Sequence, residues 1–196
     1  PHWRLAEQAF DRVVLATSAS NAAPALDQSA PSAPDSIASA LRGWNASALR
    51  LQHQQIATVY AQANVTAPGP LLRAPMLALR PGADGPAQFV FERDAITRPQ
   101  RATRVLAFVV SASTQERAEL TAAITAQARR QLGLAVAPLL TVTEKRATFA
   151  CTPGLQRPSM RIAPGLLACG DYIDGPYPAT LEGAVRSGLQ AAQALG

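Results

Sequence analysis

The C-terminal segment 166–195 places an apolar strand, a Gly-Asp turn and a long amphipathic helix in direct succession. Four apolar residues, 166–169, precede Gly170 and Asp171. After a short loop, apolar residues recur at the spacing of one helix face; they are Leu181, Ala184, Val185, Gly188, Leu189, Ala192 and Leu195. This order predicts that a strand end and a helix N-terminus meet at the carboxyl edge of a sheet, where open α/β folds bind ligands.

The start of the predicted helix is well marked. Thr180 is the expected N-cap, and Glu182 precedes Arg186 in the order that favours a helical ion pair. Because Ala184 and Gly188 are small, the helix can lie close to a sheet. A helix N-terminus carries about half a positive charge and free N–H groups, so it suits a phosphate or a ligand that becomes anionic. The periodicity alone is equally typical of a terminal helix that packs only for stability.

The residues of this segment carry a family resemblance. The stretch GDYIDGPYPATLEGAVRSG, residues 170–188, resembles the C-terminal flavin motif of the FAD-dependent amine oxidase and phytoene desaturase superfamily. The resemblance implies that Gly170 allows close approach of the backbone to FAD and that Asp171 bonds the ribityl or phosphate region. It also implies that Thr180, Leu181 and Glu182 face the N1–C2 carbonyl edge of the flavin, where the helix dipole stabilises the anionic reduced form.

Residues 10–26, 75–93 and 144–172 resemble the squalene-associated branch of that superfamily, the bacterial hydroxysqualene dehydroxylases of hopanoid synthesis. The implied activity is that of an FAD-dependent oxidoreductase acting on an apolar isoprenoid, in which reduced FAD donates a hydride to an allylic carbon as hydroxide leaves. Tyr177 is the candidate proton donor, and Tyr172 is interpreted as a packing residue. A phytoene-type desaturase, with hydride transfer in the opposite direction, is an alternative. An amine oxidase ranks third because aromatic residues make up only 5% of the chain.

Members of this superfamily hold the FAD pyrophosphate with a glycine-rich G-x-G-x-x-G turn. This sequence contains no Gly-x-Gly. We therefore expect the C-terminal portion of a longer enzyme, with FAD bound in the intact enzyme but not by this chain alone, which is expected to be inactive. A non-catalytic binding or assembly module is the competing hypothesis. An apolar patch on the last strand and helix predicts self-association of the chain.

Composition limits the classes of partner. The net charge is +5, but the basic residues are scattered and aromatic residues are few, so nucleic-acid binding is not indicated. The local basic cluster of Arg93, Arg98, Arg101 and Arg104 is interpreted as a solvated loop. The charge leaves open a peripheral contact between a cytoplasmic protein and the inner face of a bacterial membrane. The two cysteines and two histidines are far apart and indicate neither a metal site nor a disulfide framework.

The expected fold class is α+β. Residues 1–163 are predicted to form part of a mixed-sheet substrate domain, and residues 164–196 the last strand and helix of an FAD-binding domain whose glycine-rich half is absent. Strands are expected at 12–17, 75–80, 87–93, 104–113 and 138–151, helices at 35–44 and 114–133, and a loop at 27–36. Pro24 is expected to interrupt a short helix, and residues 48–64 remain ambiguous between helix and strand.

Overall fold

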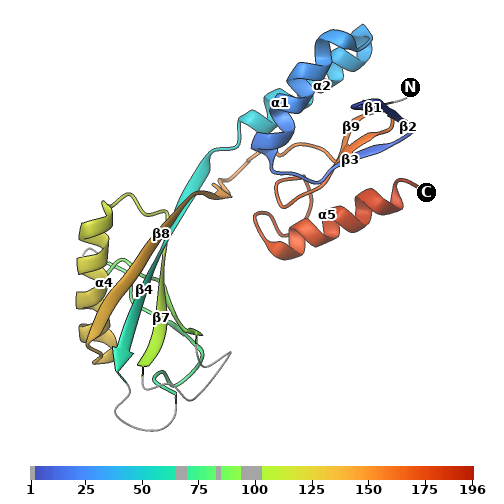
Figure 1. Cartoon of the computed structure of the whole chain (residues 1–196). Helices are drawn as coiled ribbons and strands as arrows, with labels where there is room; N and C mark the ends of the chain where they lie inside the picture. Colours follow the sequence, from blue (N-terminus) through green and yellow to red (C-terminus); the bar gives the residue numbers. More distant parts are fainter. Residues whose placement is uncertain (1–2, 65–69, 83–84, 94–102) are drawn as a thin grey trace. The chain divides into compact units, whose positions relative to one another are not determined.

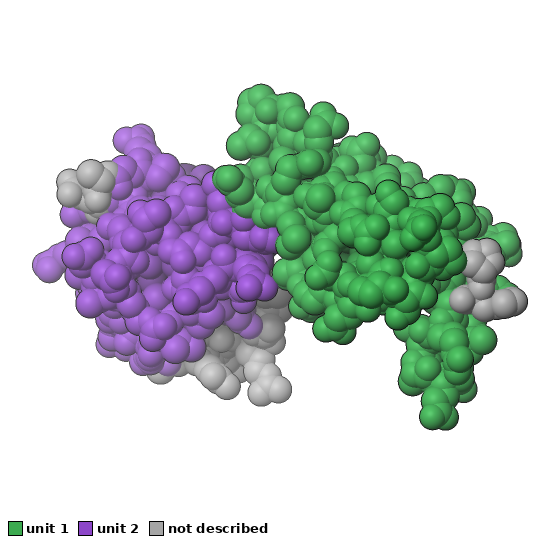
Figure 2. Space-filling view, turned by 90° about the horizontal axis from the view of Figure 1, so that it is seen from above, with its two compact units in different colours: residues 1–52, 149–196 green, residues 53–148 purple. Residues whose placement is uncertain are grey.

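The computed structural model describes residues 3–64, 70–82, 85–93 and 103–196, and the chain forms two compact units (Figure 2). The first unit contains residues 1–52 and 149–196, and the second contains residues 53–148. The boundary expected at residues 163–164 is not one of these divisions. It lies inside the first unit, between the paired strands β9 (Arg161–Ala163) and β10 (Leu166–Ala168). The assignment of one domain to substrate and the other to FAD stays a prediction.

A three-stranded sheet in the order β3-β10-β9 forms the centre of the first unit. The strand β3 (Val13–Leu15) pairs with β10 in parallel, whereas β9 pairs with β10 in antiparallel orientation. Every residue of β10 is buried. Because successive side chains point to opposite faces of a strand, complete burial means that both faces of this sheet are covered. A short hairpin of β1 (Trp3–Leu5) and β2 (Gln8–Phe10), which the sequence did not predict, lies outside this sheet.

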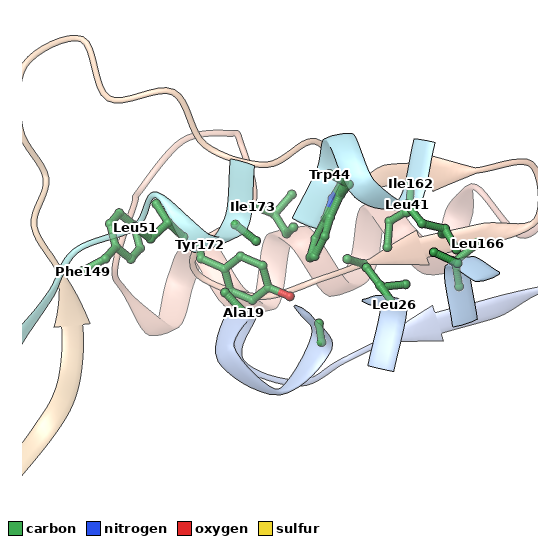
Figure 3. Close-up of a cluster of buried hydrophobic side chains, with 14 of the residues drawn as sticks. Ala19, Leu26, Leu41, Trp44, Leu51, Phe149, Ile162, Leu166, Tyr172 and Ile173 are labelled. Carbon is green, nitrogen blue, oxygen red and sulfur yellow. The ribbon is translucent and has the colours of Figure 1, made fainter. Parts of the chain in front are cut away.

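Two helices form the largest core of the first unit together with one face of this sheet. The helix α1 (Ala19–Ser29) is followed by the one-turn helix η1 (Ala30–Ser32) and by α2 (Asp35–Leu49). Figure 3 shows Leu26, Leu41 and Trp44 from these elements beside Leu166 of β10. The expectation that Pro24 interrupts α1 is wrong. Pro24 is exposed, and the buried residues around it hold the helix in the core despite the lost backbone hydrogen bond.

The final helix, α5 (Leu181–Gln193), confirms the prediction of a C-terminal helix. The expected apolar patch on this helix is confirmed, because Leu181, Val185 and Leu189 are exposed, whereas the same expectation for the last strand is wrong, because all three residues of β10 are buried. The residues that α5 buries are Gly183, Ser187 and Ala191, so small side chains face the unit, while the apolar stripe faces solvent. Figure 1 shows α5 on the other side of the sheet from α1 and α2.

The second unit is a five-stranded sheet in the order β5-β6-β7-β4-β8, with the helix α4 (Arg117–Leu132) against one face (Figure 1). Its strands are β4 (His53–Asn64), β5 (Met76–Ala78), β6 (Phe89–Glu92), β7 (Thr103–Ser111) and β8 (Val136–Phe149). The ambiguous segment 48–64 is therefore mostly strand. The β-branched and aromatic residues Ile56, Thr58, Val59 and Tyr60 in the middle of β4 favour this outcome. The helix α4 begins at Arg117 with Glu116 as its N-cap, so the expected start of this helix at residue 114 is wrong.

A buried ion pair anchors the second unit. The Arg104 Nε atom lies 3.7 Å from Glu92 Oε1, and both side chains are almost completely buried. The Glu92 carboxylate also accepts hydrogen bonds from the backbone N–H groups of Leu71 and Leu72. The interpretation of Arg104 as part of a solvated basic loop is therefore wrong. Arg98 and Arg101 of the same predicted cluster lie outside the described residues.

Candidate flavin-facing turn and apolar sheet face

The parallel strands β3 and β10 end at the same edge of their sheet, and the candidate site begins there. The N–H group of Cys169 donates to the carbonyl oxygen of Leu15, the last residue of β3, at 3.0 Å, which continues the pairing one residue past the end of β10. The chain then turns at Gly170 and Asp171 on one strand and enters α1 on the other. This is the position at which open α/β sheets bind ligands.

Gly170 is required here by packing. A Cβ atom at this position would lie 2.6 Å from Cε1 of Tyr172, so only glycine leaves room for that ring. The Gly170 N–H donates to Ser187 Oγ of α5 at 3.2 Å. The Gly170 N–H group is therefore not free to bind a ligand, because it already has an acceptor within the chain. Close approach of FAD to this residue stays a prediction.

Asp171 provides a carboxylate at the edge of the sheet. Its backbone carbonyl accepts the N–H of Ala179 at 3.2 Å, which fixes the residue in the loop. Among the described residues, no hydrogen bond or ion pair involves its carboxylate, and the residue is half-buried. A carboxylate that is positioned through its own backbone remains available to accept hydrogen bonds from a hydroxyl-rich ligand such as a ribityl chain.

The loop between Asp171 and α5 is held in an unusual conformation. Tyr177 and Ala179 both have a φ of 57°, in the left-handed region that disfavours side chains. Arg157 supports the loop from the preceding segment: its guanidinium donates to the carbonyl oxygens of Ile173 and Gly175. These bonds satisfy backbone carbonyls that the tight loop leaves without regular partners.

The first turn of α5 is exposed to solvent. Thr180 Oγ1 accepts the N–H of Gly183 at 3.0 Å, which confirms Thr180 as the N-cap. In the described part of the chain, the N–H groups of Leu181 and Glu182 have no acceptor, as expected for the first turn of a helix. Leu181 is 88% exposed. Two free N–H groups at the positive end of an exposed helix fit the electron-rich carbonyl edge that the resemblance assigns to them.

The Glu182 carboxylate forms an ion pair within α5. Its Oε1 atom lies 2.6 Å from Arg186 Nε, so the predicted ion pair is confirmed. The Arg186 guanidinium also lies 5.1 Å from the ring centroid of Tyr177. This contact places a cation beside the one exposed tyrosine of the loop, which is 52% exposed. The Tyr177 ring thus packs against the guanidinium that pairs with Glu182.

Tyr172 occupies a different environment. It is 4% exposed and packs edge-on against Trp44, with ring centroids 6.3 Å apart (Figure 3). Burial raises the pKa of the Tyr172 hydroxyl, with smaller contributions from Cys169 and Asp171. No described residue bonds its hydroxyl. A packing role is the interpretation that this geometry supports.

Two contributors to the site were missed by sequence reasoning. Arg157 lies between the strands β8 and β9, and no local pattern in the sequence marks it as a support for the loop. Ser187 could have been found, because Gly183, Ser187 and Ala191 recur at four-residue intervals. Such a stripe of small residues indicates the face on which a helix approaches its neighbour most closely.

A second candidate surface is the face of the five-stranded sheet that points away from α4. Residues such as Val59 and Phe108 belong to the core under α4, so alternate residues of the same strands point to the opposite face. One row across that face, in register, consists of Met76, Phe91, Ala107 and Tyr60. Neighbouring positions include Phe89, Val105 and Val109. No described helix covers this apolar face.

The described residues contain no helix long and apolar enough to cross a membrane. They also contain no group of three or more His, Cys, Asp or Glu side chains that could hold a metal ion.

Comparisons with known proteins agree with this geometry. The profile of the flavin-containing amine oxidoreductase family matches residues 5–196. Over 60 residues, the chain is 45% identical to the hydroxysqualene dehydroxylase of Rhodopseudomonas palustris, a match that covers 28% of this chain and 14% of that protein.

Solved structures extend the similarity to the fold. A candidate protoporphyrinogen oxidase from Exiguobacterium sp. 255-15 superposes with a TM-score of 0.61 at 15% identity, covering 96% of this chain and 41% of the other. An oxidoreductase from Methanosarcina mazei superposes with a TM-score of 0.60 at 16% identity, covering 95% of this chain and 43% of the other. The chain thus spans less than half the length of these relatives. At such low identities, the superpositions show the fold alone.

Proposed function

The chain belongs to the flavin-containing amine oxidoreductase family, and we propose from this that it acts in an FAD-dependent enzyme that reduces hydroxysqualene to squalene. The observation that carries the proposal is the 45% identity, over 60 residues, to a hydroxysqualene dehydroxylase. The apolar sheet face of the second unit, which no described helix covers, supports it, because a long hydrocarbon substrate needs a wide apolar surface.

The turn and helix start described above fit the redox end of FAD. Asp171 would accept hydrogen bonds from the ribityl hydroxyls, and the N–H groups of Leu181 and Glu182 would donate to the flavin carbonyl edge. The described residues lack a glycine-rich turn for the pyrophosphate. These residues would therefore provide only part of the binding free energy of the cofactor.

The reaction replaces the allylic C–O bond with a C–H bond and releases water, so it consumes one hydride and one proton. Reduced FAD, when bound, supplies the hydride. We assign the proton to the Tyr177 hydroxyl, either directly or through a water. Tyr177 is exposed in the loop that leads to α5, where its ring lies against the Arg186 guanidinium, so its hydroxyl is accessible to a substrate or a water. Tyr172 is unsuited to this role because its hydroxyl is buried.

The proposal is tested with a protein that carries this chain together with a glycine-rich FAD-binding segment. Reduced under anaerobic conditions, it is expected to convert hydroxysqualene to squalene, followed by gas chromatography and mass spectrometry. Tyr177→Phe should lower kcat by about 100-fold, the usual contribution of a positioned proton donor, whereas the matched change Tyr172→Phe should not.

The same assay separates the alternatives. If the reduced protein leaves hydroxysqualene unchanged while the oxidised protein inserts double bonds into phytoene or squalene, the dehydroxylase proposal is wrong and a desaturase is indicated. Oxidation of primary amines with release of hydrogen peroxide would instead indicate an amine oxidase.

A further inference from the structure

The loop that carries Tyr177 is exposed along its length. Every residue of 174–178 is exposed, whereas Ile173 before this stretch is buried and Ala179 after it is half-buried. Apolar packing therefore fixes the two ends of the stretch, and the position of its middle depends on hydrogen bonds. Tyr177 has a φ of 57° there, and a residue with a side chain keeps such a conformation only where its surroundings determine it.

The sequence restricts where this stretch can bend. Tyr177 lies between Pro176 and Pro178, and each proline ring fixes its own φ and limits the residue before it. The most permissive residue on the N-terminal side of Tyr177 is Gly175, which has a φ of 154°. A contact that fixes Gly175 therefore also fixes the direction in which the chain enters Tyr177.

Arg157 makes that contact. Its Nη1 atom donates to the carbonyl oxygen of Ile173 at 2.7 Å, and its Nη2 atom donates to the carbonyl oxygen of Gly175. The Nη2 atom also lies 3.6 Å from Oδ1 of Asp174. The guanidinium, whose side chain is only 10% exposed, thus contacts three successive residues of the loop. Its rigid fork of donors suits this role, whereas the ammonium group of lysine is a single point charge.

The segment that carries Arg157 is itself fixed to the core of the first unit. Pro158 is completely buried, and its carbonyl oxygen accepts the N–H of Asp174 at 2.8 Å. The next carbonyl oxygen, that of Ser159, accepts Nε1–H of Trp44 at 2.8 Å. Arg157 therefore extends from a rigid support to an exposed loop, which is the arrangement that a positioning side chain requires.

We propose that Arg157 is a positioning residue, which fixes Gly175 and through it the place of the Tyr177 hydroxyl in the candidate site. On the other side, the Tyr177 carbonyl oxygen accepts the Thr180 hydroxyl at 2.7 Å, so the loop is held from both directions. The part of Tyr177 in proton transfer rests on the proposed function. The effect of Arg157 on the place of Tyr177 rests on these contacts alone.

The proposal is tested first on the chain itself, which contains three tyrosines. Incorporation of fluorotyrosine gives a fluorine resonance for each, and replacing each tyrosine in turn by phenylalanine assigns them. The test variant is Arg157→Lys, which keeps the charge near Asp174 but removes the fork that reaches both carbonyl oxygens. The matched control is Arg161→Lys, at an exposed arginine of β9. Thermal melts establish that both variants fold.

The Tyr177 resonance is expected to move or broaden in Arg157→Lys, because the ring leaves its place against Arg186. The Tyr60 resonance, in the second unit, should stay unchanged. Arg161→Lys should leave all three resonances as in the wild type. An unchanged Tyr177 resonance in Arg157→Lys would overturn the proposal.

A second variant tests the same transmission with Arg157 intact. Pro176→Gly adds a permissive residue between the held carbonyl oxygen of Gly175 and Tyr177, at an exposed position. It should therefore change the Tyr177 resonance as Arg157→Lys does. If Arg157→Lys does not fold, an unchanged Tyr177 resonance in Pro176→Gly overturns the proposal instead.

Activity provides a further readout, in the protein that carries this chain together with a glycine-rich FAD-binding segment. Arg157→Lys should lower kcat for hydroxysqualene about tenfold or more. In the Tyr177→Phe background it should cause no further loss, because it acts through that hydroxyl. A merely structural role would lower kcat by the same factor in both backgrounds, and that result would overturn the proposal. If the wild type does not convert hydroxysqualene, the proposed function is wrong, and the fluorine resonances decide whether Arg157 positions Tyr177.

Discussion

At the scale of single residues, Gly183 is the position in the candidate site that least tolerates a larger side chain. A Cβ atom there would overlap the carbonyl oxygen of Tyr177 and lie 3.1 Å from its carbonyl carbon. These are backbone atoms, so a rotamer change cannot relieve the contact. The loop that carries Tyr177 and the first turn of α5 therefore fit together only with glycine at this position.

We expect Gly183→Ala to destabilise the protein by about 1–3 kcal/mol, as overpacking commonly does, and to displace the loop. The matched control is Gly188→Ala in the same helix, where nothing lies within 4 Å of the added atom. That change should stabilise the protein by about 0.5–1 kcal/mol, because glycine is a poor helix former. Urea unfolding checks both values. Equal effects at the two positions would show that the loop does not constrain Gly183.

At the scale of secondary-structure elements, the start of α5 depends on its cap. Thr180 Oγ1 accepts a hydrogen bond from Gly183, whereas Ser18, the N-cap of α1, makes no side-chain capping bond. Thr180→Ala should therefore destabilise the protein by about 1 kcal/mol, and Ser18→Ala by less than about 0.5 kcal/mol. Hydrogen exchange should become faster in the first turn of α5 only in the Thr180 variant. An unchanged exchange rate there would contradict the assigned cap.

Prediction from sequence succeeded where one element is specified by its own pattern. The strand at β10 and the helix α5 follow from period, cap and turn residues, and β7 follows from its apolar run. Prediction failed where the environment of a residue depends on contacts with another element of the fold. The burial of Arg104 depends on Glu92, which contacts it only after β6 and β7 pair, and local composition contains no sign of that contact.

The face that α5 buries likewise could not be predicted from the local sequence pattern. Periodicity identified a stripe containing Leu181, Val185 and Leu189, and the usual expectation is that such a stripe faces the core. In the structure these residues are 88%, 59% and 59% exposed, whereas Gly183 and Ser187 are buried. Close approach to the Tyr177 loop requires small side chains, and this steric requirement determines the orientation of the helix.

At the scale of the whole molecule, the exposed stripe on α5 predicts self-association. The change Val185→Gln/Leu189→Gln should shift the chain from dimer or larger species towards monomer, because it removes apolar area that association would bury. The control is Leu139→Gln/Leu140→Gln on β8, where the side chains are 53% and 56% exposed. Light scattering over a range of concentrations measures the difference. A wild-type chain that stays monomeric throughout would contradict this prediction.

The central claim is that the turn after β10 and the start of α5 form the flavin-facing part of an FAD-dependent enzyme. Asp171 is the residue whose side chain is assigned to the cofactor, and Asp174 is a matched acid in the same loop, 75% exposed and 3.6 Å from Arg157. Because solvent screens the charge of the exposed Asp174 side chain, its ion pair with Arg157 is expected to contribute little to stability. Replacing each aspartate by alanine therefore distinguishes a cofactor contact from a general change in the loop.

The most direct test is the dissociation constant for FAD, measured by flavin fluorescence in a protein that carries this chain together with a glycine-rich FAD-binding segment. Asp171→Ala should weaken binding by about 10- to 100-fold, because it removes a charge-assisted hydrogen bond worth about 1.5–3 kcal/mol. Asp174→Ala should change it by less than about threefold. If the two variants bound FAD as tightly as the wild type, the turn would not contact the flavin and the account would be wrong.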